Sequence, residues 1–373
     1  MTFSIHSVTY FALSLLTTFC LSCQSKTVSQ HSKRNTSQTI KYATGFEISK
    51  VDSITTILIK NPYLDASEKF SYNFSKSKYE GTIQIPLKRV VVTSTTHIPM
   101  LELLNQERAL VGFPHTSYVS SLKTRALIEQ NMIKDVGQDA NLNTEILLNL
   151  NPEAVVAFSM QKTNKSLNLV EQHGIPVLIN GDWLEETPLG RAEWIKFFGV
   201  LFDKEKEADS IFKRIEQNYL NAKKIAKSTT TSPTILSGAI MQKDIWSLPA
   251  GDSFVAQYLK DANTNYLWQN TSGKGSLSLS FETVLDKAQH ADIWVSPGYF
   301  NTAEDMLNQN PLYEKFRAFN NIYSPNLKKG ATGGVLYYEL GPTRPDLVLK
   351  DLIKIAHPEV LPDYNFTFFE KFN

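Results

Sequence analysis

The sequence predicts an α/β fold of two Rossmann-like parallel-sheet lobes, joined by a long linking helix and preceded by a small N-terminal β extension. Residues 142–159 (LNTEILLNLNPEAVVAFS) align with residues 279–296 (LSFETVLDKAQHADIWVS) without a gap. Each copy has the pattern of a short helix followed by a buried strand. Residues 187–228, between the two copies, have helical spacing almost throughout. A tandem pair of α/β lobes on a helical connection accounts for all three observations.

The first lobe is expected over residues 86–186. The continuous apolar run within 87–97 is typical of a parallel strand that is buried on both faces. Apolar residues at helical spacing follow at 98–112, and another helical segment is expected near 122–131. The remaining predicted elements are a helix over 143–150, a strand over 154–159, a helix over 168–174 and a strand over 175–181. This order predicts an open parallel sheet.

The second lobe, residues 229–373, repeats that alternation. Its predicted elements are a strand at 232–240, helices at 253–260 and 281–289, a strand at 291–297, a helix near 303–319, a strand at 321–325 and a helix at 345–357. The aligned glutamates, Glu145 and Glu282, open equivalent helices of the two lobes. The repeat therefore extends beyond the eighteen matched residues to whole lobes.

The linking segment and the β extension complete the folded part. Gly199 and Asp203 interrupt the helical pattern of 187–228, and the part over 204–227 would extend roughly 36 Å as a helix. A helix of that length makes a stiff connection. Residues 44–85 alternate apolar and polar residues, which predicts short strands.

The N-terminus has the pattern of an export signal. Residues 8–22 are apolar or small and carry no charge, a stretch too short to span a membrane comfortably. We interpret 1–23 as a lipoprotein signal peptide with Cys23 as the lipidated residue, because a small residue, Ser22, precedes it. Residues 24–43 are polar and are expected to form a flexible tether. A plain cleaved signal peptide is the alternative, and both interpretations predict an exported protein, periplasmic and, with the lipid anchor, attached to a membrane.

Composition and motifs exclude several classes. The formal net charge of +1 gives no electrostatic case for binding nucleic acid. The sequence has neither a G-x-S-x-G nucleophile elbow nor a phosphate-binding G-x-x-x-x-G-K-[ST] loop. Together with the tandem lobes, this absence argues against catalysis, and we expect no resident cofactor. An exported two-lobed enzyme and a scaffold lipoprotein are kept as alternatives.

Five stretches resemble the substrate-binding proteins of ABC importers for iron-siderophore complexes, haem and cobalamin. They are RVVVTSTTHIPMLELL, GQDANLNTEILLNLNPEAVVAF, TPLGRAEWIKFFGVLFDKE, GDSFVAQYLKDAN and LSFETVLDKAQHADIWV. The resemblance covers roughly residues 86–360. It implies two lobes on a rigid helix, a chelate ligand (a ferric siderophore first, cobalamin second, haem third) and a permease dimer with its ATPase as partner. We expect the protein itself to be a monomer.

In the same family, a glutamate on each lobe docks onto arginines of the permease. The family motif, Asn/Ser-x-Glu at the start of a helix, is matched by Asn143-Thr144-Glu145 and by Ser280-Phe281-Glu282. The resemblance thus implies that Glu145 and Glu282 dock the permease through charge-assisted hydrogen bonds. A glutamate in a first helical turn also suits the helix dipole without any partner.

Ligands of open parallel sheets bind beyond the carboxyl ends of the strands, which selects a set of loops in each lobe. These are 94–97, 114–118, 159–160 and 181–183 in the first lobe, and 241–246, 249–251, 296–300 and 332–338 in the second. These loops are rich in Tyr and Trp, whose flat rings suit a bulky chelate. The candidate ligand-binding residues are Thr95, Thr96, His97, Tyr118, Ser159, Trp183, Trp246, Tyr299, Tyr337 and Arg344. For Arg344 the alternative is a structural role that ties the last helix to the preceding loop, and Arg191 is interpreted as structural, paired with a nearby acid. His97 and His115, which could ligate haem iron or cap a siderophore, are alternatively plain polar residues. We do not expect a bare-metal site, because such a site needs several His and carboxylate residues that converge, and the predicted cleft loops do not supply them.

Overall fold

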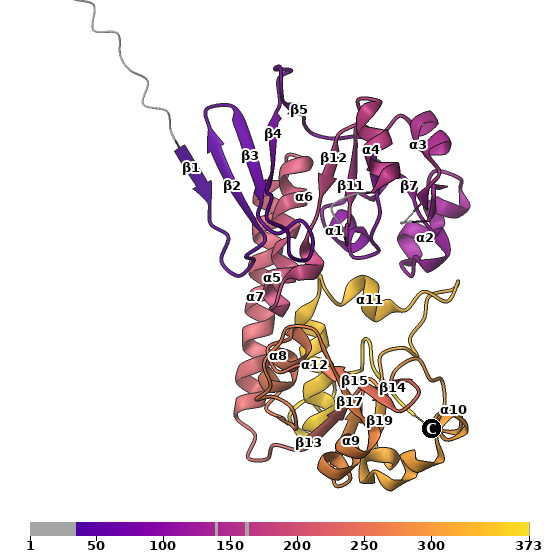
Figure 1. The fold of residues 1–373 in the computed structure, drawn as a ribbon. Helices are drawn as coiled ribbons and strands as arrows, with labels where there is room; N and C mark the ends of the chain where they lie inside the picture. Colours follow the sequence, from indigo (N-terminus) through magenta and orange to yellow (C-terminus); the bar gives the residue numbers. More distant parts are fainter. Residues whose placement is uncertain (1–34, 139–140, 161–163, 373) are drawn as a thin grey trace, which may run out of the picture. The chain divides into compact units, whose positions relative to one another are not determined.

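The computed structural model describes residues 35–138, 141–160 and 164–372. Within these residues, two α/β lobes are connected by three consecutive helices, and a mainly antiparallel sheet precedes the first lobe (Figure 1). The predicted signal peptide, Cys23 included, lies outside the described residues. Among the described residues, the helices are too short or too polar to cross a membrane.

The N-terminal sheet occupies the region predicted as a β extension. Its strands lie side by side in chain order: β1 (Asn35–Gln38), β2 (Phe46–Val51), β3 (Ile54–Ile59), β4 (Phe70–Ser75) and β5 (Ile83–Gln84). Alternation along β2 and β3 buries Phe46, Ile57 and Ile59 on one face. These side chains belong to the same hydrophobic core as strand β6 of the first lobe, so the extension is packed onto that lobe.

The tether predicted for residues 24–43 is corrected in its described part. Residues 35–38 pair with β2, and the backbone N–H groups of Lys41, Tyr42 and Ala43 donate to the buried carboxylate of Glu193 at 2.6–3.0 Å. Glu185 accepts from Thr44 in the same way. The polar composition of this segment predicted a free tether. The prediction failed because the carboxylates that hold the segment lie about 140 to 150 positions away in the chain.

The first lobe, hereafter the N lobe, contains a parallel sheet in the order β12-β11-β6-β7-β8. Its strands are β6 (Val90–Val92), β7 (Leu110–Phe113), β8 (Lys134–Asp135), β11 (Ala154–Ala157) and β12 (Val177–Ile179). Its helices are α1 (His97–Leu103), α2 (Leu122–Glu129), α3 (Thr144–Leu150) and α4 (Lys165–Gln172), and a small β9–β10 pair (Gly137–Gln138, Asn141–Leu142) precedes α3. The uninterrupted burial of β6, β7 and β11 fits a sheet covered on both faces.

The second lobe, hereafter the C lobe, has a sheet in the order β16-β13-β18-β19-β20. Its strands are β13 (Thr234–Ser237), β16 (Asn265–Tyr266), β18 (Ile293–Val295), β19 (Ile322–Ser324) and the antiparallel β20 (Glu370–Lys371). Its helices are α8 (Phe254–Asp261), α9 (Phe281–Ala288), α10 (Ala303–Gln309), α11 (Leu336–Leu340) and α12 (Pro345–Ala356). A second, antiparallel sheet joins β14 (Ala239–Gln242), β15 (Ile245–Pro249) and β17 (Ser276–Ser280).

The two parallel sheets share one connectivity. In the N lobe, β6 lies between β7 and β11, and β12 flanks β11; in the C lobe, β13 lies between β16 and β18, and β19 flanks β18. The helices α3 and α9 lead into the equivalent strands β11 and β18. The tandem α/β lobes predicted from the sequence are therefore confirmed.

Three helices connect the lobes: α5 (Pro188–Glu193), α6 (Ile195–Leu201) and α7 (Glu205–Lys227). The long helix was predicted over 204–227, and α7 confirms it. Its N-terminal half buries Phe212 and Ile215 in the N-lobe core, and its C-terminal half buries Tyr219, Ala222 and Ala226 in the C-lobe core. A single helix thus contributes to both hydrophobic cores (Figure 1).

The N-lobe helix predicted over 98–112 is wrong in its second half. Helix α1 ends at Leu103, Asn105 has a left-handed φ of 54°, and Leu110–Phe113 form strand β7. The four residues of β7 are all buried, and the strand lies between β6 and β8 in the sheet. In a short apolar run, the periodicity of the sequence cannot distinguish a buried strand from a helix.

Candidate ligand-binding cleft

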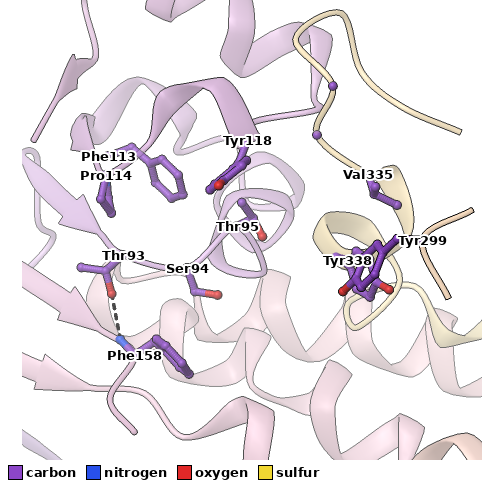
Figure 2. Close-up of a pocket in the computed structure, with 12 residues that line it drawn as sticks. Thr93, Ser94, Thr95, Phe113, Pro114, Tyr118, Phe158, Tyr299, Val335 and Tyr338 are labelled. Atoms are coloured by element: carbon purple, nitrogen blue, oxygen red, sulfur yellow. Dashed lines mark hydrogen bonds between the residues drawn. The ribbon is translucent and has the colours of Figure 1, made fainter. Parts of the chain in front are cut away.

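A pocket of about 450 Å³ opens where loops of the N lobe face loops of the C lobe (Figure 2). Its N-lobe lining comes from the ends of β6, β7 and β11 and from the turn before α2, and its C-lobe lining comes from the loop after β18 and from the segment that leads into α11. The lining residues are Thr93, Ser94, Thr95, Phe113, Pro114, Tyr118, Phe158, Tyr299, Gly333, Gly334, Val335 and Tyr338. The pocket therefore lies at the carboxyl ends of parallel strands, as the sequence predicted.

Hydroxyl groups hold the strand ends at the N-lobe wall in place. The Thr93 Oγ1 atom accepts a hydrogen bond of 3.0 Å from the backbone N–H of Phe158, which ties the end of β6 to the end of β11 (Figure 2). Beside it, the Thr96 hydroxyl donates to Asp182 at 2.8 Å. Ser94 and Thr95 lie half-buried at the pocket surface, where the hydroxyls of Ser94 and Thr96 share a hydrogen bond of 2.9 Å.

Three tyrosines supply the aromatic part of the pocket. Tyr118 reaches it from the N lobe, and Tyr299 and Tyr338 reach it from the C lobe with ring centroids 6.5 Å apart (Figure 2). Their exposed fractions, 58%, 69% and 44%, are high for large rings. Burial raises the pKa of Tyr338, so that its phenol stays protonated at neutral pH and can donate a hydrogen bond.

Of the predicted ligand-binding residues, Thr95, Tyr118 and Tyr299 line the pocket. Trp183 lies behind the lining, with its ring edge against Phe158 at a centroid distance of 5.6 Å. Ser159 is buried beside Phe158, and Thr96 is engaged by Asp182. These three residues support the wall of the pocket.

Two predicted aromatic contacts are corrected. Trp246 is completely buried in the C-lobe core, stacked on Trp294 at 5.2 Å, and its indole N–H donates to the carbonyl of Ser237. Tyr337 packs edge-on against Phe368 and Phe369 inside the same lobe. The prediction failed because Trp246 lies within β15, where alternation turns its side chain away from the cleft.

His97 and Arg344 are also corrected. The imidazole of His97 is fully buried against Phe198, and burial lowers its pKa to about 4. The guanidinium of Arg344 forms a bidentate pair of 2.8 Å hydrogen bonds with the buried Asp346, which is the structural alternative that the sequence left open. Arg191 is likewise structural: it donates to the carbonyl of Trp183 and stacks on a phenylalanine ring.

Three pocket residues fall outside the predicted loops: Thr93, Phe113 and Phe158. Phe113 is the last residue of β7, and Thr93 and Phe158 directly follow β6 and β11. The position at a strand end is the signal that could have identified them. Across the described residues, His, Cys, Asp and Glu gather nowhere in a group that could hold a metal ion.

The two aligned glutamates lie in matching local structures. The Asn143 side chain caps α3 by accepting from the N–H of Ile146, and the Ser280 side chain caps α9 by accepting from the N–H of Thr283. These caps place Glu145 and Glu282 in the first turns of their helices, where both side chains are exposed. Each lobe thus presents one carboxylate from an equivalent helix.

The model of the family described as periplasmic binding protein matches residues 90–323, well over half of the chain. The chain belongs to this family. An uncharacterised lipoprotein of Methanocaldococcus jannaschii is 30% identical over 323 residues, which cover 83% of this chain and 73% of that protein. A periplasmic binding protein captures a substrate outside the cytoplasm and is not an enzyme, which agrees with the absence of catalytic motifs in the sequence.

Solved structures share the fold of this periplasmic binding protein. One is described as a possible iron-binding (periplasmic solute-binding) protein from Staphylococcus epidermidis; it is 18% identical, with a TM-score of 0.58 over 73% of this chain and 100% of that chain. Another is a periplasmic heme binding protein from Pseudomonas aeruginosa; it is 16% identical, with a TM-score of 0.58 over 77% of this chain and 98% of that chain. At these identities the likeness establishes the two-lobed fold.

Proposed function

We propose that this periplasmic binding protein is the substrate-binding lipoprotein of an ABC importer. It captures a ferric siderophore between its lobes and delivers the complex to a permease dimer with its ATPase. The observation that carries the proposal is a pocket between two lobes that each present a glutamate at an equivalent, exposed position. A two-lobed protein that contacts a two-fold symmetric partner would use such a pair.

The lining of the pocket favours a chelate with little net charge. Its described residues are hydroxyl-bearing, aromatic or small, and none of them carries a charge. A buried anion needs a cationic or multiply hydrogen-bonding partner. Ferric trihydroxamates are neutral at the metal centre, whereas ferric tricatecholates are anionic. A neutral chelate gripped by Tyr118, Tyr299 and Tyr338 therefore fits best.

Haem is the second candidate. The names of fold relatives from Pseudomonas aeruginosa and Vibrio cholerae state that those proteins bind haem. Tyrosine is also one of the axial ligands that proteins use for haem iron. The raised pKa of Tyr338 opposes direct ligation, because a protonated phenol is a poor iron ligand. Cobalamin has no comparable support.

We propose that Cys23 carries the lipid that anchors the protein at the membrane surface. The names of two archaeal relatives, both uncharacterised lipoproteins, support this assignment. Two or more acyl chains on one cysteine would give stable attachment.

Replacing both docking glutamates tests the proposed function. We expect Glu145→Ala/Glu282→Ala to abolish uptake of the iron chelate by cells while its affinity for the purified protein stays unchanged, because both side chains lie outside the pocket. Glu304→Ala is the matched control, since Glu304 is an exposed glutamate in the first turn of another C-lobe helix. Normal uptake by the double variant would refute docking through these residues.

A further inference from the structure

Residues 328–340 form a projection of the C lobe toward the pocket. A compact turn begins it: the N–H of Gly330 donates to the carbonyl of Gly334 at 2.7 Å, and the N–H of Leu336 donates to the carbonyl of Lys328 at 3.0 Å. Helix α11 follows directly and packs its Leu336 and Tyr337 against the C-lobe core. The base of the projection is thus fixed to the C lobe, while its turn is held by its own backbone hydrogen bonds.

The same projection is attached to the N lobe by hydrogen bonds. The carboxylate of Glu339, on α11, accepts from the backbone N–H groups of Ser120 and Ser121 at 2.6 and 2.9 Å. The Thr332 hydroxyl donates to the carbonyl of Ser117 at 2.6 Å. Ser120 and Glu339 are both buried, so the carboxylate contact is shielded from water, whereas the contact between Thr332 and Ser117 is exposed.

Two glycines allow the backbones of the two lobes to touch. A Cβ atom at Gly334 would lie 2.1 Å from the carbonyl oxygen of Tyr118, and one at Gly330 would lie 2.6 Å from the Cα atom of Ser120. Any side chain at either position would force the projection off the N lobe. The close fit at these two positions therefore depends on the absence of side chains.

The attachment also forms one wall of the pocket. Gly333, Gly334, Val335 and Tyr338 of the projection line it, opposite Thr95 and the other N-lobe residues (Figure 2). Tyr118 lines the pocket from the N lobe and lies two residues before Ser120, which Glu339 holds. Detaching the projection from residues 117–121 would therefore open the pocket.

We propose that residues 328–340 are a clasp that closes the pocket by reversible attachment to residues 117–121. A ligand enters and leaves when the clasp detaches, while the contact along α7 stays intact. The route for the ligand rests on the proposed function, whereas the reversible attachment does not require any ligand. Glu339 holds the clasp through hydrogen bonds, and Gly330 and Gly334 permit the close approach.

Hydrogen–deuterium exchange of the ligand-free full chain tests the attachment. In Glu339→Ala, both N–H groups lose their side-chain acceptor, so we expect the amides of Ser120 and Ser121 to exchange at least about tenfold faster than in the wild type. The control is Glu304→Ala. Unchanged exchange at the two serines, or an equal increase throughout β6 and β13, would overturn the proposal.

Gly334→Val gives an independent steric test. We expect the same local increase in exchange, together with dissociation of a bound ferric trihydroxamate that is faster by about tenfold or more. Gly275→Val is its control, because a Cβ atom at Gly275 meets nothing within 4 Å. Faster exchange without faster dissociation would refute the clasp as the ligand route. A wild type that binds none of the chelates would refute the proposed function instead, and the exchange data alone would then decide whether the clasp detaches.

Discussion

Along α7 the lobes share a helix whose apolar side chains enter both hydrophobic cores, whereas at the clasp they meet through backbone groups, one carboxylate and one threonine hydroxyl. The stabilising free energy of a hydrophobic contact grows with the apolar area that it buries. A polar contact exchanges protein partners for water and contributes little net stability. The difference indicates that the lobes separate at the clasp and stay joined along α7.

Truncating the α7 contact should have the largest effect on stability. Phe212 is 2% exposed and lies in the N-lobe core, with Tyr42 at a centroid distance of 6.1 Å. We expect Phe212→Ala to lower the free energy of unfolding by about 3–5 kcal/mol, measured by urea denaturation. Leu220→Ala, on the same helix but 41% exposed, should cost no more than about 1 kcal/mol. Equal losses in the two variants would contradict a buried α7 contact.

A pH titration should test how the polar contact at the clasp depends on the protonation of Glu339. Burial raises the pKa of Glu339 from about 4.5 to about 7, and the nearby carboxylate of Glu102 adds to the rise, whereas the two backbone N–H donors oppose it. The closed clasp therefore binds a proton more tightly than the open one. Its stabilising contribution is complete below pH 4.5 and is lost as the pH rises through about 7.

We therefore expect protection of the Ser120 amide, corrected for intrinsic exchange, to fall by about tenfold or more between pH 5 and pH 8. Burial keeps His97 of α1 neutral, and on α2 Lys123 is paired with Glu107 while Arg125 donates to a backbone carbonyl. Protection that is independent of pH, or that rises toward pH 8, would contradict this assignment to Glu339.

Periodicity and repetition predicted most of the fold. The paired helices at Glu145 and Glu282 and the long helix over Glu205–Lys227 carry strong local patterns, and all three are present. Strand β7 was missed because a four-residue buried strand has no period of its own. The β14–β15–β17 sheet was also missed, and its third strand, β17, is separated from β15 in the chain by helix α8.

The candidate site was predictable only as a set of loops. The strand-end rule located the loops that contain Thr95, Tyr118 and Tyr299, because the carboxyl ends of parallel strands share one edge of a sheet. The rule could not orient Trp246, whose burial depends on its register in β15. Glu339 was missed altogether, since its partners lie 218 and 219 positions away in the chain.

The most direct test of ligand capture between the lobes is a tryptophan-fluorescence titration, because Trp183 lies behind the pocket wall and the other four tryptophans are buried. The probes are a ferric trihydroxamate, a ferric tricatecholate, haem and cyanocobalamin, each corrected for its absorbance. We predict saturable quenching by the trihydroxamate with a Kd at or below about 1 µM, roughly −8 kcal/mol.

The pocket is tested in the same titration with Tyr118→Ala/Tyr299→Ala, which should weaken binding at least about tenfold because it removes one aromatic wall from each lobe. Tyr79→Ala, an exposed tyrosine outside the pocket, should bind like the wild type. That pattern is the result that our account predicts. The account would be contradicted if no probe gave a saturable response, or if the double variant bound as tightly as the Tyr79→Ala control.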